Sequence, residues 1–420
     1  MKTIIVIGDG MSDLPIEKLG GRTPLMVAQK PHIDRIAREG RMGLLRTIGE
    51  TGPADSAVAN LAVLGYDASA SAQGRAVLEA ASMGVAIGDG DVAVRCNLIC
   101  LEGDPADRRI RNHSAGHISS AEAAELIHAL DAALGAGRGP QPAFFYPGVS
   151  YRHLLVFRGG WASPAVTCAP PHDNLGGSVA ELLPRPATDD PAAHTTAGRL
   201  TELYRRALPI LAEHPVNAAR RAAGQDEANS IWTWSPGRRP AMPTLQERFG
   251  IRAAVISAVD LVQGIGVYAG MDRITVAGAT GLHDTNYEGK AEAALDALRD
   301  HDLVYVHVEA TDEASHARDL ELKIRCIEYL DQRLVRLILD GLRARQLAAT
   351  VAILPDHPTP VTTGQHGRDP VPVAILTPGL SPDATQRFDE SQAAQGSLGR
   401  LTGERFMRLA LGSDAQRRPA

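Results

Sequence analysis

The feature that most constrains the fold is an alternation of short apolar runs with helical patterns in the first and last thirds of the chain. Short apolar runs bounded by glycine or polar residues are typical of buried parallel strands. Strands alternating with helices predict a doubly wound, mostly parallel α/β sheet. The expected strands are residues 3–7, 253–256, 303–308, 351–354 and 371–376. The expected helices are residues 31–39, 56–64, 290–298, 320–342 and 398–411.

The middle of the chain follows a different pattern. Ser119-x-x-Glu122 predicts a helix start, and Gly135 predicts the end of that helix. Proline and glycine become frequent after this point, and residues 153–157 form a strand-like run. We interpret residues 111–250 as an α+β domain inserted into a discontinuous core of residues 1–110 and 251–420. A chain of 420 residues is long enough for such a division.

Charge and composition exclude several classes of partner. A net charge of −6 gives no bulk attraction to nucleic acid or to anionic membranes, so an anionic substrate requires a local basic or metal-loaded site. The first apolar run ends at Gly8, too early for a signal peptide, and no run approaches the ~20 residues of a membrane span. The four cysteines include no CxxC pair, which predicts reduced thiols and a cytoplasmic location. The sequence leaves the oligomeric state open.

Carboxylate and imidazole side chains follow the expected strands. Because ligands of open α/β sheets bind beyond the carboxyl ends of the strands, these side chains are well placed for a site. Carboxylates and imidazoles together can hold Zn²⁺ or Mn²⁺. Alone, each cluster could equally be an ordinary turn, a helix start or a solvated loop. The candidate ligands are Asp9, the i,i+4 pair Asp312 and His316, the adjacent pair Asp356 and His357, and His366.

Ser56 is the candidate nucleophile. It stands at the start of the expected helix 56–64, where backbone N–H groups and the helix dipole favour a developing alkoxide or phosphate. A plain helix-capping serine is the alternative. Beside a metal site, the hydroxyl would be activated, because coordination lowers its pKa.

The order Asp, Asp-x-x-x-His, Asp-His, His resembles the two-metal site of the alkaline phosphatase superfamily. Along nearly the whole chain, the sequence is similar to cofactor-independent phosphoglycerate mutases of the archaeal type. The segments that carry this similarity include Gly20-Gly21-Arg22-Thr23-Pro24-Leu25, Val58-Ala59-Asn60-Leu61, Asp91-Val92-Ala93-Val94-Arg95-Cys96-Asn97, His214-Pro215-Val216-Asn217 and Gly278-Ala279-Thr280-Gly281.

The resemblance implies an alkaline-phosphatase-like core and a complete site. One metal would be held by Asp9, Asp356 and His357, the other by Asp312, His316 and His366, with Ser56 as nucleophile and further ligand. The implied ions are Mn²⁺ or Zn²⁺, with Co²⁺ and Mg²⁺ as alternatives. The implied activity is the glycolytic interconversion of 2- and 3-phosphoglycerate through phosphoserine, without 2,3-bisphosphoglycerate.

Basic side chains would retain the small phosphorylated hydroxy-acid substrate during this reaction. Arginine suits carboxylate and phosphate because it binds both in a bidentate manner. For each basic candidate, the alternative is a surface or structural role. The candidates are Arg75, Arg95, Arg152, Arg220 and Lys290.

The sequence departs from the family pattern in two places. Asp55 and Ala57 flank Ser56 where the family usually has glycine and aspartate, and Ala72-Gln73-Gly74-Arg75 lacks the usual tyrosine. The extra negative charge of Asp55 beside the nucleophile puts turnover of the usual substrate in question.

The middle domain is more similar to a branch proposed to act as alternative homoserine kinases. The segments concerned are Ser114-Ala115-Gly116-His117-Ile118-Ser119, Phe145-Tyr146-Pro147-Gly148-Val149-Ser150-Tyr151-Arg152-His153 and Ile231-Trp232-Thr233-Trp234. Transfer to or from homoserine or another small hydroxy or amino acid, and simple phosphatase activity, therefore remain alternatives. A non-catalytic phosphate-ester binding protein is a third, but such a protein would not need Ser56.

Overall fold

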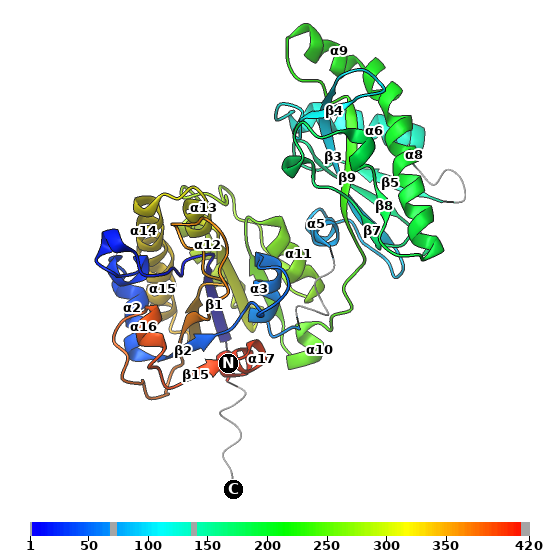
Figure 1. The fold of residues 1–420 in the computed structure, drawn as a ribbon. Coiled ribbons are helices and arrows are strands. Elements are labelled where there is room, and N and C mark those ends of the chain that lie inside the picture. The colour runs from blue at the N-terminus through cyan, green and yellow to red at the C-terminus, as the bar shows by residue number, and fades with distance from the viewer. Residues whose placement is uncertain (1, 68–73, 136–140, 413–420) are drawn as a thin grey trace. The chain divides into compact units, whose positions relative to one another are not determined.

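The computed structural model describes residues 2–67, 74–135 and 141–412 (Figure 1). The chain forms two compact units, one of Met1–Ala72 with Ala241–Ala420 and one of Gln73–Pro240. The boundary near residue 110 that we expected from the sequence lies too late, because β3 (Val92–Glu102) is the central strand of the second unit's sheet. The chain re-enters the first unit at Ala241 and not at residue 251 as expected, so that α10 (Leu245–Phe249) belongs to the first unit.

The first unit is built on an eight-stranded sheet in the order β11-β10-β12-β1-β13-β14-β2-β15. The pairs on either side of β1 are parallel, and in this sheet only β14 runs antiparallel to both of its neighbours. The mostly parallel α/β fold predicted from the sequence is therefore confirmed. The strands are β1 (Lys2–Gly8), β2 (Arg41–Leu45), β10 (Ala253–Ile256), β11 (Asp272–Arg273), β12 (Leu303–Val308), β13 (Ala349–Leu354), β14 (Val371–Leu376) and β15 (Gly399–Leu401).

Helices cover both faces of this sheet (Figure 1). One layer contains α2, α12 and the long helical segment α14–α15, whose buried side chains pack with the sheet residues Val6, Val306 and Ile353 in the main core. The other layer contains α3, α11 and α17. The helices are α1 (Pro24–Val27), α2 (Pro31–Glu39), α3 (Ser56–Val63), α10 (Leu245–Phe249), α11 (Asp260–Tyr268), α12 (Tyr287–Ala297), α13 (Ala310–His316), α14 (Leu320–Tyr329), α15 (Arg336–Ala344), α16 (Glu390–Ala393) and α17 (Gly403–Ala410), with a 3₁₀ turn at Glu17–Leu19.

Two helix predictions need adjustment. The expected helix 320–342 is continuous, but Leu330–Val335 is π-helical between α14 and α15. The expected helix 398–411 is wrong over its first residues, because Gly399–Leu401 pairs with β2 as a strand. Helix α17 starts only after Thr402, whose side chain accepts a hydrogen bond from Arg405 N.

The second unit has a five-stranded antiparallel sheet in which β3 pairs with β4, β6 and β9. Its core lies between one face of this sheet and the helices α6 and α8, and includes Val94, Cys96 and Leu98 of β3. The elements are α5 (Arg75–Ser82), β3, β4 (Arg109–Asn112), α6 (Ser120–Leu134), β5 (Ala143–Tyr146), β6 (Arg152–Phe157), β7 (Val166–Thr167), a 3₁₀ turn (Pro171–Asp173), α7 (Val179–Leu182), β8 (Arg185–Pro186), α8 (Pro191–Glu213), α9 (Pro215–Ala222) and β9 (Ser230–Gly237). The predicted capping box of Ser119 and Glu122 is present at α6.

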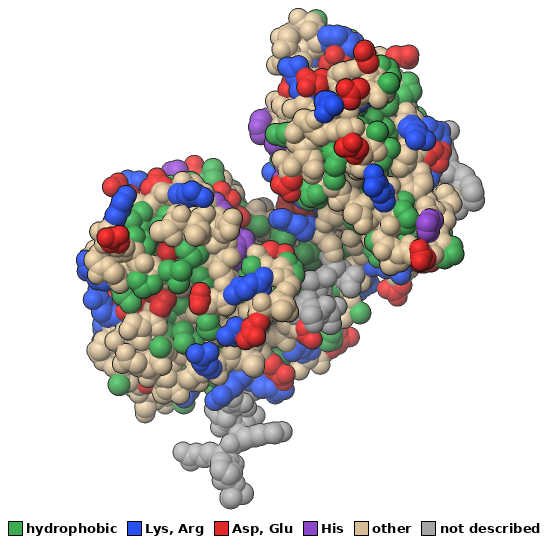
Figure 2. All heavy atoms as spheres, in the orientation of Figure 1, with side chains coloured by type: hydrophobic (Ala, Val, Ile, Leu, Met, Phe, Trp, Pro, Cys, Tyr) green, Lys and Arg blue, Asp and Glu red, His purple; other side chains and the backbone are tan. Residues whose placement is uncertain are grey.

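The surface carries charges of both signs. On the face drawn in Figure 2, acidic and basic side chains are interspersed over each unit. Within the described ranges, no helix combines the length and apolar character that crossing a bilayer requires.

Candidate active site

The predicted metal ligands converge at the carboxyl ends of three neighbouring strands of the first unit. Strand β1 lies between β12 and β13, with Ile7 opposite both His307 and Leu354. The three strands therefore end at one level, and the segments that follow them carry Asp9, Asp312 and Asp356. This register is why carboxylates separated by hundreds of residues in the sequence meet in space.

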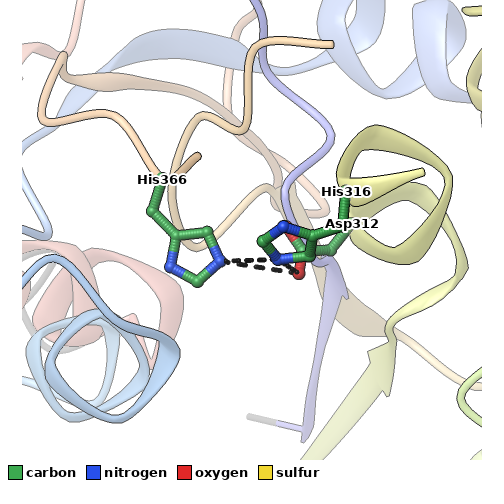
Figure 3. Close-up of side chains that lie close together, drawn as sticks. All are labelled: Asp312, His316 and His366. Carbon is green, nitrogen blue, oxygen red and sulfur yellow. Dashed lines mark hydrogen bonds and ion pairs between the residues drawn. The ribbon is translucent and has the colours of Figure 1, made fainter. Parts of the chain in front are cut away.

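Asp312, His316 and His366 form one group (Figure 3). Asp312 Oδ2 lies 2.9 Å from His316 Nε2 and 3.6 Å from His366 Nε2, and the two Nε2 atoms are 3.0 Å apart. One carboxylate oxygen and two imidazole nitrogens thus face a common point, as ligands of a single cation would. The helix α13 brings Asp312 and His316 onto one face, as the i,i+4 spacing predicted.

Hydrogen bonds also fix the far sides of these imidazoles. His316 Nδ1 lies 2.8 Å from the carbonyl oxygen of Gly364, and His366 Nδ1 lies 3.1 Å from that of Ala54. When both carbonyls accept a hydrogen bond from Nδ1–H, the Nε2 atoms are left with free lone pairs toward Asp312. In the metal-free protein, the hydrogen bond to Asp312 raises the pKa of His316 to about 9.

Asp9, Asp356 and His357 lie beside the first group. Asp9 with Asp312 and His357 forms one possible metal-binding set, and Asp9 with Asp356 and His307 forms another. His357 Nε2 lies 3.4 Å from Asp9 Oδ1 and 3.6 Å from Asp356 Oδ2. All five side chains of these sets are buried.

The electrostatics of this second group fit a bound cation. Burial raises the pKa of Asp9 well above its usual range, and the nearby carboxylates of Asp356 and Asp312 raise it further. Asp9 Oδ1 is buried and accepts no hydrogen bond from the described residues. A buried carboxylate oxygen that accepts no hydrogen bond, with His357 Nε2 3.4 Å away and two further carboxylates beside it, is a site that a divalent cation would stabilise.

His307 is a site residue that the sequence analysis missed. Its Nε2 lies 3.1 Å from Asp9 Oδ2, and its Nδ1 lies 3.3 Å from Ser257 Oγ. Burial lowers the pKa of His307 to about 4, so the ring is neutral. Because His307 lies within the apolar run of β12, the sequence pattern predicts only a buried core residue at this position. Its place beside Asp9 follows from the strand register, which sets His307 opposite Ile7.

Thr359 and Gly10 join the two groups. Thr359 Oγ1 lies 2.5 Å from Asp312 Oδ1 and 3.1 Å from His357 Nδ1. Gly10 has a φ of 60°, and a Cβ at this position would lie 2.3 Å from Asp312 Oδ1 and 2.7 Å from Thr359 Oγ1. Glycine is therefore required here both by its backbone conformation and by the close approach of the ligands.

Ser56 points into this cluster. It is the first residue of α3, and its Oγ lies 3.1 Å from His357 Nε2. Asp55 is the N-cap, with its carboxylate accepting from Val58 N at 2.9 Å. The unusual aspartate beside the nucleophile thus caps the helix, which leaves the Ser56 hydroxyl free of that role.

Asn60 connects the nucleophile helix to the ligand loop. Its amide nitrogen donates to the Ser56 carbonyl and to Asp356 Oδ2, both at 2.8 Å. Its amide oxygen accepts from the Tyr305 hydroxyl at 2.6 Å. Asn60 was recognised only as part of a family motif, and its contacts now explain its position four residues after Ser56.

Three of the five basic candidates lie near one another in the second unit. Arg95 stacks on Trp234, with its guanidinium carbon 3.9 Å from the ring centroid, and pairs with Glu79 at 2.9 Å. Burial lowers the pKa of Arg95, and the positive charges of Arg75 and Arg152 lower it further. Arg75 and Arg152 are exposed.

Aromatic and histidine side chains adjoin these arginines. Arg152 lies over the Tyr151 ring at 4.9 Å, and the rings of His113 and His117 contact Tyr151. The ring of His172 contacts Trp234 with centroids 5.2 Å apart. The arginines and these rings together form a cationic, aromatic surface on the second unit, which we call the arginine cluster.

The other two basic candidates are occupied by structural contacts. Arg220 is buried and donates to both oxygens of Glu122 and to the carbonyls of Ala115 and Asp226, so the expectation that it binds substrate is not supported. Lys290 is also buried, and its ammonium donates to the His307 carbonyl at 3.0 Å. Burial lowers the pKa of Lys290 to about 8. Its contacts support the strand that carries His307. Of the sequence segment around Arg75, Ala72 and Gln73 lie outside the described residues.

Similarity to known proteins covers almost the whole chain. A family model described as 2,3-bisphosphoglycerate-independent phosphoglycerate mutase matches residues 37–217. A protein of that name from Methanosarcina barkeri is 48% identical over 95% of this chain and 96% of its own length. A probable 2,3-bisphosphoglycerate-independent phosphoglycerate mutase from Geobacter sulfurreducens is 46% identical over 98% of this chain and 100% of its own length.

Solved structures agree with this similarity. A protein from Pyrococcus horikoshii superposes with a TM-score of 0.81 at 28% identity, covering 100% of this chain and 99% of the other. The cofactor-independent phosphoglycerate mutase from Thermoplasma acidophilum superposes with a TM-score of 0.69 at 27% identity, covering 98% and 99%. With this identity and coverage, the chain belongs to the family of 2,3-bisphosphoglycerate-independent phosphoglycerate mutases.

Proposed function

We propose that this enzyme interconverts 2-phosphoglycerate and 3-phosphoglycerate through a phosphoserine on Ser56, without 2,3-bisphosphoglycerate. The observation that carries the proposal is the position of the Ser56 hydroxyl, 3.1 Å from His357 Nε2 at the start of α3. Around it lie the carboxylate and imidazole groups of the predicted ligand set. The high identity to proteins named as such mutases supports the same substrate.

Two divalent cations would be held by the two groups of side chains. Asp312, His316 and His366 supply one carboxylate and two imidazoles, a donor set that suits Mn²⁺ or Zn²⁺. Asp9, Asp356 and His357, with Ser56, supply the second set. Bound there, the cations would neutralise phosphoryl charge and lower the pKa of the Ser56 hydroxyl.

The chain's own residues then perform the transfer in two halves. Ser56 Oγ attacks the substrate phosphorus, the bond from phosphorus to the glycerate oxygen breaks, and phosphoserine and glycerate result. The glycerate reorients and its other hydroxyl attacks the phosphoserine, which regenerates Ser56. The N-terminal N–H groups of α3 favour negative charge at this position in both halves.

Retention of glycerate separates a mutase from a phosphatase. The arginine cluster offers guanidinium groups that can bind the carboxylate of the acid, with Arg75 and Arg152 exposed for this purpose. We therefore propose that the inserted unit supplies the substrate contacts and covers the phosphoserine from water. All four cysteines are free thiols, which supports a reducing, cytoplasmic location.

A second candidate is phosphoryl transfer to or from homoserine or a similar amino acid. It is favoured by the composition of the arginine cluster, because the segments that resemble the homoserine kinase branch meet there. His117 contacts Tyr151, and Trp234 lies under Arg95. These rings are where a different small acid would be recognised.

Turnover by the metal-loaded protein tests the two candidates against each other. Purified enzyme is chelated, dialysed and reloaded with Mn²⁺, Zn²⁺, Co²⁺ or Ca²⁺, and is then assayed with 3-phosphoglycerate in a coupled assay for 2-phosphoglycerate. Homoserine with ATP is assayed in parallel. We expect mutase activity with the first three ions and little with Ca²⁺, because imidazole ligands suit softer cations. Turnover of homoserine with ATP, without turnover of 3-phosphoglycerate, would show that homoserine is the substrate instead of phosphoglycerate.

A further inference from the structure

Lys323 is a fully buried lysine that belongs to neither group of proposed ligands. It lies on α14, and its ammonium donates to the carbonyl oxygens of Ser12 and Thr359 at 3.2 and 2.8 Å. The third hydrogen bond, at 2.8 Å, goes to Asp13 Oδ2. An ammonium has three donors, so all of them are used.

The positions of the three acceptors are informative. Ser12 and Asp13 belong to the segment that follows β1 and carries Asp9, whereas Thr359 belongs to the segment that follows β13 and carries Asp356 and His357. Burying an ammonium is costly unless its charge is paired and its remaining protons are hydrogen-bonded. The two carbonyls that meet this need come from different segments, so Lys323 links the two ligand-bearing segments at a single point.

Further contacts join the same two segments around this point. Thr359 N donates to the Ser12 carbonyl at 3.2 Å, and Val361 N donates to Asp13 Oδ2 at 3.1 Å. Partly buried Glu390 accepts from Ser12 Oγ and from Asp13 N, and so holds the β1 segment from the other side.

The link continues from Thr359 into the site. The backbone carbonyl of Thr359 binds Lys323, while its hydroxyl oxygen lies 2.5 Å from Asp312 Oδ1 and 3.1 Å from His357 Nδ1. A shift of the Thr359 backbone therefore moves the hydroxyl that fixes one side chain of each ligand group.

We propose that Lys323 is a positioning residue for the metal centre. Its ammonium sets the separation of the β1 and β13 segments and, through Thr359, the placement of the Asp312 carboxylate and the His357 imidazole. Its ammonium donates to Ser12, Asp13 and Thr359, which are not among the proposed ligands. The inference rests on the proposed metal site but not on phosphoglycerate as the substrate.

The competing explanation is that Lys323 only balances the charge of buried Asp13. Lys30 offers a matched control, because it is equally buried and pairs with Asp34 at 2.6 Å. Asp34 belongs to α2, away from the ligand segments. Replacing Lys30 thus removes a buried ammonium from the same unit without disturbing the link between the segments.

The test compares Lys323→Met, the double variant Lys323→Met/Asp13→Asn and Lys30→Met with the wild-type full chain. Each chelated protein is titrated with Co²⁺ or Mn²⁺ by calorimetry, and the visible absorption of the Co²⁺ form is recorded. Thermal unfolding of the metal-free proteins is measured alongside. The double variant removes both charges, so it keeps the test valid where the single variant fails to fold.

Changes around metal ligands typically weaken metal affinity by about 10- to 100-fold. We expect a weakening of this size, with altered Co²⁺ bands, for Lys323→Met and for the double variant, and wild-type affinity for Lys30→Met. Wild-type affinity and bands in the double variant would show that Lys323 only neutralises Asp13, and would overturn the proposal. A wild-type protein that binds no metal would instead remove the proposed metal site itself, and the inference with it.

Discussion

The hydroxyl oxygen of Ser56 lies 3.1 Å from Nε2 of His357, at the point where the start of α3 meets the segment after β13. Asn60 reinforces this contact, because it donates both to the Ser56 carbonyl and to Asp356. The candidate nucleophile and the adjacent ligand pair are thus held by one hydrogen-bonded unit. All of these residues belong to the first unit, so the position of α3 against the ligand segments is set within that unit.

Replacing Ser56 by alanine should abolish phosphoryl transfer. Removing a nucleophile typically costs several orders of magnitude in kcat, and we expect a loss of at least about 1000-fold. Fold and metal content should remain, since the cap at Asp55 and the six other ligand positions are unchanged. Phosphoenzyme trapping with ³²P-labelled substrate should label the wild type and not Ser56→Ala. Activity near the wild-type level would instead indicate direct attack by water.

The two ligand groups should lose metal independently. His316 belongs to the group with Asp312 and His366, whereas His357 lies against Asp9 and Asp356. We expect His316→Ala and His357→Ala each to lower metal content by about one ion per chain, because each removes an imidazole from a different site. Elemental analysis after dialysis measures this, with exposed His283→Ala as the control. Unchanged content in both variants would contradict the ligand assignment.

The sequence predicted the core of the site because its signals are local. Asp9, Asp356 and the pair Asp312 and His316 follow apolar runs directly, so strand ends could be read as ligand positions. The parallel register that brings these ends together is typical of a doubly wound sheet. Strand 371–376 was also predicted, although its antiparallel direction was not visible in the pattern.

The remaining features depend on contacts between distant segments. His307 reads as a core residue, and its role appears only from its 3.1 Å contact with Asp9. Arg220 and Arg152 look alike in sequence, yet one is buried on Glu122 and the other is exposed. The early unit boundary was missed because β3 looks like one more core strand, while its partners β6 and β9 come much later in the chain.

Arg152 and Arg220 should therefore differ in their effects. Arg152→Ala removes an exposed guanidinium of the arginine cluster, so we expect stability within about 0.5 kcal/mol of wild type and a rise of about 10- to 100-fold in the KM for phosphoglycerate. Hydrolysis of p-nitrophenyl phosphate, which lacks a carboxylate, should change little. Parallel loss of both activities would contradict a role in substrate recognition.

Arg220→Ala should act on stability instead. It removes the pair with Glu122 and leaves the carbonyls of Ala115 and Asp226 without their donor. We expect the second unit to lose about 2–4 kcal/mol of unfolding free energy, with KM unchanged for the protein that remains folded. Urea unfolding combined with steady-state kinetics measures both. A rise in the KM for phosphoglycerate without loss of stability would instead show that Arg220 contacts the substrate.

Acid should destabilise the second unit through His153. Burial lowers the pKa of this histidine from 6.5 to about 3, and Gly148 N donates to its Nδ1 at 3.0 Å. Below pH 6.5 the unfolded chain therefore binds a proton that the folded chain does not, so stability is present above that pH and is lost as the pH falls toward 3. The expected loss from this group is up to about 1.4 kcal/mol per pH unit.

The three tryptophans make this loss measurable, because Trp161, Trp232 and Trp234 all lie in the second unit. Urea unfolding followed by tryptophan fluorescence at pH 7.5, 6.5 and 5.5 should show the acid loss in wild type and a smaller one in His153→Gln, which cannot take up the proton. Replacing exposed His128 by glutamine should leave the wild-type slope, since its ring is in solvent in both states. Equal slopes in wild type and His153→Gln would assign the acid sensitivity to other groups, because the buried imidazole would then contribute no difference in proton binding between the two states.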